Sequence, residues 1–280
     1  MVKTYNQLLE DYKRYLKYSG KSERTIYLYV KRVEDFLKYI GKQVDKIDRQ
    51  DIMRYYEYLE KAKKYSNRSM YAVGWALRSF FQMIGKHEVA MWIPTPSFTV
   101  IREPEWIPED KIMCVIDHDP VLCVAYDLAL RLREITLLRV ENYNPETGEI
   151  EVYRLKKKGQ PMAQILVLGG TEPKTHCREV LNAYLNSIGN PRKGKLFNIS
   201  DRAIQYRFKK RLEMCGLDPN QYTFHSLRHS RLTHMAIYQL RSKGYVDIVS
   251  LAKFAGHSRP DTTMMYVHLA HKYLSFRTKK

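Results

Sequence analysis

The first 85 residues carry apolar side chains at intervals of three and four positions, with polar and charged residues between them. This period is typical of helices that bury one face and expose the other. The clearest block spans residues 22–41, where a serine in the N-cap position opens the pattern and a glycine closes it. Three further blocks have the same period. The first ends at Gly20, the second covers residues 49–62, and the third opens near Ser66 or Asn67. The pattern predicts a small all-helical N-terminal domain over residues 1–88.

The helical period disappears between Gly85 and Lys111. This stretch holds four prolines with β-branched residues between them, and a proline restrains both itself and the preceding residue to extended backbone. We therefore predict an extended linker over residues 89–106. The helical pattern resumes at Pro108, where two acidic residues follow the proline as in the first turn of a helix. A second domain is accordingly predicted over residues 107–280.

The second domain combines two kinds of pattern. Residues 111–118 and 121–140 have the helical period, whereas residues 146–155 and 163–168 alternate or run apolar as strands do. A lysine-rich hairpin separates the two predicted strands. The helical period then returns to the end of the chain, with breaks at glycines. The sequence thus predicts a mainly α fold with one small antiparallel sheet, an α+β arrangement.

The charge balance is strongly basic, because 48 lysines and arginines outnumber 30 aspartates and glutamates to give a formal net charge of +18. The excess is spread over both predicted domains. A polyanionic partner is indicated, and nucleic acid is the commonest one. Ribosome association and an anionic membrane surface are the alternatives that charge alone leaves open.

The four cysteines form no C-x-x-C pair, and no signal peptide precedes them. We therefore predict reduced, buried thiols in a cytoplasmic protein. No apolar run approaches the length that spans a bilayer, so no membrane association is expected.

Two short segments place reactive side chains at fixed intervals. In FHSLRHSRLTHM, His225 and Arg228 lie three residues apart and so project from one face of a helix. In GHSRPDTTMMYVH, His257 follows a glycine and precedes Tyr266. Taken singly, Tyr266 would be a core tyrosine. Arg131, within the helical pattern of residues 121–140, would be a surface arginine.

A metal site is not predicted. Three histidines fall close together at positions 225, 229 and 234, but the H-E-x-x-H pattern is absent and no carboxylate lies nearby to complete a ligand set.

The motifs ALRLREITLLRVENY, the lysine-bearing hairpin, HSLRH and GHSRPDTTMMYVH resemble, in order and spacing, the catalytic domain of tyrosine recombinases, the phage integrase and Xer family. The likeness covers nearly the whole chain, because the N-terminal helices resemble that family's helical core-binding (SAM-like) domain. It implies site-specific cleavage and rejoining of double-stranded DNA through a 3′-phosphotyrosyl intermediate and a Holliday junction. It also implies a homotetramer on two DNA sites, a monomer when free, and no cofactor.

The resemblance assigns a role to each matching position. Tyr266 is the nucleophile, Arg131 and Arg228 hold the phosphate, and His257 donates a hydrogen bond to it. His225 accepts a proton near Tyr266. Glu134 and His229 support these residues. One departure is Ala129, which stands where the family has glycine.

The resemblance also implies a lysine that protonates the leaving 5′ oxygen. The hairpin tip KKKGQP suggests Lys157 for this role, with Lys156 and Lys158 as rivals that would otherwise contact DNA. A basic cluster around the third and fourth predicted helices, including Lys64 and Arg68, is a second candidate DNA contact. A merely solvated face is the alternative for this cluster.

Two other functions compete with recombination. A type IB topoisomerase-like enzyme would use similar residues without exchanging partners, and a non-catalytic DNA-binding protein would keep only the fold. The sequence also leaves open whether a recombinase of this kind resolves chromosome dimers or integrates and excises mobile elements. The segment after Tyr266 predicts either docking onto a neighbouring subunit or a frayed basic tail.

Overall fold

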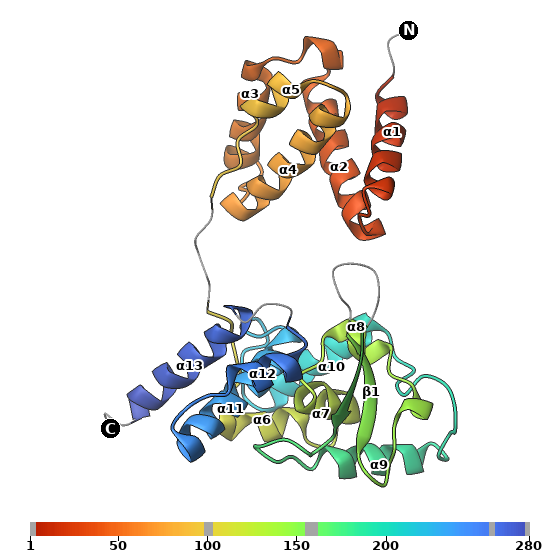
Figure 1. The fold of residues 1–280 in the computed structure, drawn as a ribbon, viewed down its shortest axis with the longest axis vertical. Coiled ribbons are helices and arrows are strands. Elements are labelled where there is room, and N and C mark those ends of the chain that lie inside the picture. The colour runs from red at the N-terminus through yellow and green to blue at the C-terminus, as the bar shows by residue number, and fades with distance from the viewer. Residues whose placement is uncertain (1–3, 98–102, 155–161, 258–260, 278–280) are drawn as a thin grey trace. The chain divides into compact units, whose positions relative to one another are not determined.

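The computed structural model describes residues 4–97, 103–154, 162–257 and 261–277 of the 280-residue chain. The chain divides into two compact units, residues 1–101 and 102–280. Both units are mainly helical, and a two-stranded antiparallel sheet lies in the second (Figure 1). The predicted α+β class is confirmed. None of the described helices combines the length and the hydrophobicity needed to cross a bilayer.

The first unit is built from helices with capped N-termini, including the predicted cap at Ser22. Thr4, Ser22, Asp48 and Ser66 each accept a hydrogen bond from a backbone N–H in the first turn of the following helix. The helices of this unit are α1 (Tyr5–Tyr18), α2 (Glu23–Ile40), the short 3-10 helix η1 (Val44–Lys46), α3 (Arg49–Lys61), α4 (Asn67–Met83) and α5 (His87–Trp92). Aromatic side chains that meet edge to face form much of its core, namely Tyr12, Phe36, Tyr55, Phe80 and Phe81.

The predicted linker is wrong in its first residues. Residues 87–92 form α5, and Val89, Ala90 and Ile93 are buried in the core of the first unit. The Arg78 side chain also donates to the carbonyl oxygen of Ile93 at 2.8 Å. A helix of six residues is too short for its period to stand out from the prolines that follow.

The second unit surrounds one nearly completely buried helix, α7. Its helices are α6 (Glu109–Ile116), α7 (Pro120–Asp127), α8 (Leu132–Thr136), η2 (Val140–Asn142), α9 (Cys177–Ser187), α10 (Asp201–Met214), α11 (His225–Lys243), α12 (Ile248–Ala255) and α13 (Asp261–Arg277). Strand β1 (Glu149–Arg154) pairs with β2 (Met162–Val167) so that Glu149 faces Val167 and Arg154 faces Met162.

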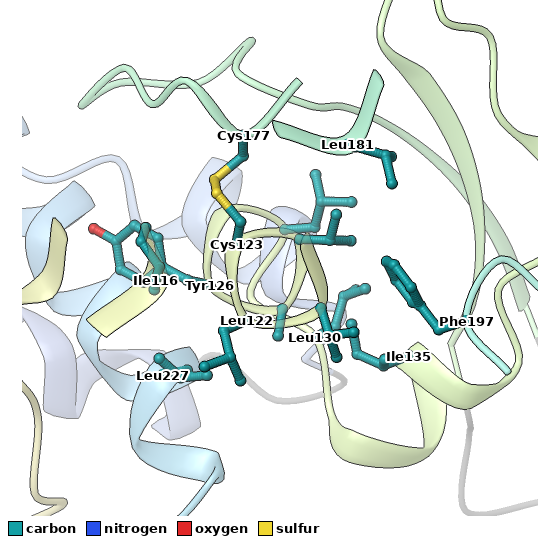
Figure 2. Close-up of a cluster of buried hydrophobic side chains, with 14 of the residues drawn as sticks. Ile116, Leu122, Cys123, Tyr126, Leu130, Ile135, Cys177, Leu181, Phe197 and Leu227 are labelled. Atoms are coloured by element: carbon teal, nitrogen blue, oxygen red, sulfur yellow. A yellow bond between two sulfur atoms is a disulfide. The ribbon is translucent and has the colours of Figure 1, made fainter. Parts of the chain in front are cut away.

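Two buried clusters hold this unit together. The larger one gathers Leu122 of α7, Leu130, Ile135 of α8, Phe197 and Leu227 of α11 (Figure 2). The smaller one forms where α11, α12 and α13 pack together (Figure 1), and it contains Leu232, Leu251, Tyr266 and Leu269. The second cluster fixes the helix that carries Tyr266 against the helix that carries Arg228.

The predicted helix over residues 121–140 is interrupted. Helix α7 ends at Asp127, and α8 begins only at Leu132. Between them Ala129 is buried and has a φ of 47°, in the left-handed region where a Cβ atom is unfavourable. The break makes Arg131 the N-cap residue of α8, with extended backbone, and not a residue inside a helix. The left-handed backbone at Ala129 gives a physical reason for the glycine that the resemblance implies at this position.

The prediction of reduced thiols is wrong. Cys114 of α6 is bonded to Cys215 at the end of α10, and Cys123 of α7 is bonded to Cys177 of α9. Figure 2 shows the second bridge beside the larger core cluster. The partners are 101 and 54 residues apart in the chain, so no local spacing pattern could indicate that they meet.

We expect these bridges to contribute strongly to stability. Closing loops of 101 and 54 residues removes entropy from the unfolded chain worth about 4 kcal/mol for each bridge. Reduction should therefore lower the midpoint of urea unfolding, as followed by circular dichroism. In a Cys114→Ala, Cys215→Ala double variant, reductant should cause only about half of that loss. The expectation would be contradicted if the oxidised protein and the fully reduced protein had equal midpoints of urea unfolding, with reduction verified by a thiol reagent.

Candidate active site

Arg131 is held by an acid on its own short helix. The Arg131 backbone N–H donates to Glu134 Oε2 at 2.9 Å, and Arg131 Nη1 donates to Glu134 Oε1 at 2.8 Å. Glu134 is 1% exposed, whereas the Arg131 side chain is 35% exposed. Burial alone would raise the pKa of Glu134, but the charges of Arg154 and Arg131 and their hydrogen bonds outweigh it, so the pKa is lowered. The ionised glutamate orients the guanidinium and leaves part of it open to a ligand.

Arg228 is a buried cation on the first turns of α11. Its guanidinium donates to the carbonyl oxygens of Ala129 and Ala255, the latter at 2.6 Å. Burial, and then the charges of Arg131 and Arg154, lower the pKa of Arg228 to about 9, so it stays charged at neutral pH. No carboxylate of the described residues forms an ion pair with it. A desolvated positive charge offset mainly by carbonyl dipoles is suited to receive an anion.

Tyr266 lies inside the cluster of α11, α12 and α13, with 1% of its surface exposed. Its hydroxyl and His229 Nδ1 form a hydrogen bond of 3.0 Å. Burial raises the pKa of Tyr266 to about 12, while the charges of Arg228 and Arg131 act in the opposite direction. The fields of both arginines therefore reach the phenol.

His257 lies against the other side of Tyr266. The two rings are parallel within 8°, with centroids 6.1 Å apart. His257 Nδ1 is hydrogen-bonded to the buried Thr263 hydroxyl at 2.9 Å, so Nε2 is the nitrogen that can bond a phosphate oxygen. Thr263 was not predicted from the sequence, because nothing local marks a threonine as a histidine partner.

The histidines of the site are neutral at pH 7. Burial first, and then nearby positive groups, lower the pKa of His229 and of His257 to about 3. Part of the His225 ring is exposed, and its pKa is lowered to about 4 by desolvation and by Arg228 and Arg131. Neutral imidazoles can accept a proton. The contact with the phenol belongs to His229, while His225 packs edge to face on His229 with centroids 4.5 Å apart.

Arg154 is the site residue that the sequence did not indicate. It is 1% exposed at the end of β1, and its Nη1 donates to Glu134 Oε2 at 2.8 Å. Glu134 thus joins two arginines. With Arg228, the site holds three guanidinium charges and one carboxylate, which leave a local charge of +2 when the histidines are neutral.

The predicted residues thus fall into three groups. Arg131, Glu134, His225, Arg228, His229, His257 and Tyr266 come together around one positively charged site. Lys156, Lys157 and Lys158 lie outside the described residues. Lys64 and Arg68 are exposed in the first unit, at the turn between α3 and α4 and in the first turn of α4. Across the described ranges, no three histidine, cysteine, aspartate or glutamate side chains gather as a metal site requires.

Comparison with known proteins gives two matches to family models. One, described as the phage integrase N-terminal SAM-like domain, matches residues 8–90. The other, described as the phage integrase family, matches residues 110–272. The chain is also similar to "Tyrosine recombinase XerA" of Thermococcus onnurineus, with 27% identity over 98% of this chain and 94% of that protein.

Two solved structures share the fold over most of the chain. XerH site-specific recombinase bound to its palindromic difH substrate matches 99% of this chain and 97% of its own, with a TM-score of 0.68 and 14% identity. A lambda integrase tetramer bound to a Holliday junction matches 95% of this chain and 77% of its own, with a TM-score of 0.68 and 14% identity.

Proposed function

The chain belongs to the phage integrase family, as its motifs predicted, and from this premise we propose that it is a tyrosine-type site-specific DNA recombinase. It cleaves one DNA strand by forming a 3′-phosphotyrosyl bond and passes the strand to a second duplex through a Holliday junction. One observation carries the proposal: the Tyr266 hydroxyl is hydrogen-bonded to His229 Nδ1 at 3.0 Å and its ring is stacked on that of His257, in the same positively charged site as Arg131 and Arg228.

The two arginines suit the charge that develops on the phosphate. A phosphodiester carries one negative charge, and more charge collects on its non-bridging oxygens as the nucleophile attacks. Planar guanidinium groups bind such oxygens with two parallel hydrogen bonds and require no metal. One such contact at 4 Å and an effective dielectric of 20 is worth about 4 kcal/mol.

The phenol needs a proton acceptor. Because the pKa of Tyr266 is about 12, ionising its hydroxyl at pH 7 costs on the order of 7 kcal/mol. This cost exceeds the stabilisation of about 4 kcal/mol that one arginine contact provides. His229 Nδ1 is in contact with the hydroxyl, so we assign proton transfer from Tyr266 to His229 Nδ1 as the phenol oxygen attacks phosphorus. The negative charge of the bound phosphate raises the pKa of His229 from its low value in the free protein and so favours this transfer. This replaces His225 as the first acceptor and leaves His225 to bond the phosphate or to relay the proton.

The P–O bond to the 5′ oxygen breaks as the tyrosyl bond forms, and the departing oxygen takes a proton. Lys157 remains our candidate donor, with Lys156 and Lys158 as rivals, since this lysine-rich segment directly follows β1 and its Arg154. The phosphotyrosyl ester conserves the energy of the broken bond, so attack by a free 5′ hydroxyl rejoins the strand without ATP.

We further propose that the protein acts on double-stranded DNA in the cytoplasm, as a tetramer on two sites. The net charge of +18 favours a phosphate backbone. Lys64 and Arg68 of the first unit are candidate backbone contacts.

The proposal is tested with nicked suicide duplexes, in which the cleaved fragment diffuses away and traps the intermediate. Because the target is unknown, a duplex pool with a randomised central region is used at low salt. We expect a covalent protein–DNA band on denaturing gels and a phosphotyrosyl peptide containing Tyr266 by mass spectrometry. A peptide that links through another residue, or no adduct from the whole pool, would count against it. With a recovered site, two intact duplexes should give Holliday junctions, whereas a topoisomerase-like enzyme would only relax or nick DNA.

A further inference from the structure

Arg154 has no part in the reaction as described so far, yet it is among the most deeply buried charged residues of the chain. Its side chain is 2% exposed. It ends β1 at the base of the hairpin, directly before the segment that carries the three lysines. A charge in such a place is costly unless its surroundings use it.

The guanidinium of Arg154 joins four parts of the unit. Nη1 donates to Glu134 Oε2 at 2.8 Å, and Nε donates to Gln164 Oε1 of β2 at 2.9 Å. Nη2 donates to the carbonyl oxygen of Phe254 at 2.7 Å and reaches that of Leu128 at 3.4 Å. These partners lie in α8, β2, α12 and the turn before Arg131.

Each of these contacts leads to a residue of the proposed site. Glu134 orients Arg131, and the Leu128 carbonyl belongs to the turn that precedes Arg131. Phe254 lies in the last turn of α12, three residues before His257. Gln164 also donates to the carbonyl oxygen of Lys253 at 3.0 Å, which ties the second strand to the same helix end.

Arg154 closely approaches the end of α12 at Gly256. Its φ is 65°, and a Cβ atom at this position would lie 3.1 Å from both Cδ and Nε of Arg154. The glycine therefore serves two purposes, since it permits the left-handed turn before His257 and makes room for the arginine.

Only an arginine can make this set of contacts. Its planar fork presents donors in several fixed directions, whereas a lysine ammonium is a single point at the end of a flexible chain. Its charge also acts beyond its contacts. After burial and the charges of Arg228 and Arg131, Arg154 further lowers the pKa of His257.

We propose that Arg154 is a positioning residue for DNA cleavage: it holds the Glu134–Arg131 pair, the His257 end of α12 and the base of the lysine hairpin in one geometry, and adds positive charge behind the phosphate. The inference rests on the proposed function, since it concerns the same reaction. It assigns no contact between Arg154 and DNA.

The test compares single-turnover cleavage of a recovered suicide duplex by the full-length protein and its variants. In Arg154→Met, which keeps the bulk but removes donors and charge, the cleavage rate should fall on the order of 10- to 100-fold. The Kd for the intact duplex should stay within about threefold, because Arg154 is buried. Arg154→Lys should recover only part of the rate. The matched control is Arg178→Met, because Arg178 also donates to loop carbonyls, those of Pro145 and Glu146, but does not contact Glu134.

A pH profile separates positioning from general destabilisation. Glu134 faces Arg131 at the N-cap of α8, Arg154 on β1, and His225 and Arg228 on α11. The charge of Arg154 offsets part of the effect of burial on the Glu134 carboxylate. Without Arg154, the pKa of Glu134 should therefore rise. The acid limb of the cleavage profile should then move to higher pH. In a Glu134→Gln background, Arg154→Met should cost less than it does alone, because the two residues act as a unit.

The outcomes are distinguishable. If the wild type forms no Tyr266 adduct, the proposed function fails before Arg154 is tested. If the wild type cleaves and folded Arg154→Met cleaves at the same rate, or more slowly with an unmoved acid limb, the inference is overturned. Should Arg154→Met not fold, Gln164→Met removes one partner at the half-buried edge. A cleavage rate equal to that of the wild type in this variant would overturn the inference equally.

Discussion

Tyr266→Phe is expected to form no covalent adduct with DNA, while its affinity for the intact duplex stays within about twofold of the wild-type value. Phenylalanine preserves the ring that packs in the cluster of α11, α12 and α13 and removes only the hydroxyl. Without that oxygen, no nucleophile remains in contact with His229. Loss of one buried hydrogen bond should change stability by only about 1 kcal/mol.

The chain offers a closely matched control. Tyr126 is 2% exposed, and its hydroxyl is hydrogen-bonded to Nδ1 of His234, also on α11, at 2.7 Å. Tyr126→Phe therefore removes the same kind of phenol–imidazole contact, beside Arg231 and not beside Arg131 or Arg228. It should form the adduct on suicide duplexes at the wild-type rate. An adduct in Tyr266→Phe, or its equal loss in both variants, would show that Tyr266 does not act as the nucleophile.

Arg228→Met should reduce the rate of single-turnover cleavage by about 100- to 1,000-fold, the usual effect of removing one preorganised donor from a developing anion. The same variant should lose little stability. The fall in the pKa of Arg228 from 12.5 to about 9, caused first by burial and then by the charges of Arg131 and Arg154, corresponds to on the order of 5 kcal/mol of unfavourable free energy for its charge in the folded state. The two carbonyls that lose their donor cost about 1 to 3 kcal/mol each, which together is of similar size.

Arg231, three residues further along α11, provides a comparison, because its buried charge has a carboxylate partner. It is 0% exposed and forms an ion pair of 3.1 Å with Asp127, which is also buried. Arg231→Met leaves that carboxylate without its partner, so it should lose about 3 to 5 kcal/mol of stability. The midpoint of urea unfolding should therefore change little in Arg228→Met and fall clearly in Arg231→Met. A loss in Arg228→Met as large as that in Arg231→Met would mean that Arg228 is a structural cation, and not a phosphate-binding residue.

The residues that the sequence predicted well are those with local signatures. His225 and Arg228 share one helical face because of their spacing, and the glycine before His257 is the left-handed C-cap of α12. The cap at Ser22 and the helix start at Ser66 are predicted for the same reason. Helix periodicity and capping act within a few residues, so the sequence pattern contains them directly.

The features that the sequence missed depend on distant partners. Arg154 reaches Glu134 across 20 residues and Phe254 across 100, and no spacing rule connects them. The disulfides are separated in the same way. The sequence pattern does not indicate the break at Ala129, because apolar residues continue through this left-handed position. The choice between His225 and His229 as the partner of Tyr266 required the packing of α13 on α11.

The burial of Tyr266 has a consequence for the timing of DNA cleavage. With 1% of its surface exposed and its hydroxyl occupied by His229, the phenol oxygen cannot meet a phosphorus atom unless α13 shifts relative to α11. Arg228 is equally buried, so a phosphate can reach its guanidinium only when the same packing opens, whereas part of Arg131 is already exposed. We therefore expect a structural change in the catalytic unit to precede cleavage, so that DNA binding by itself does not start the reaction.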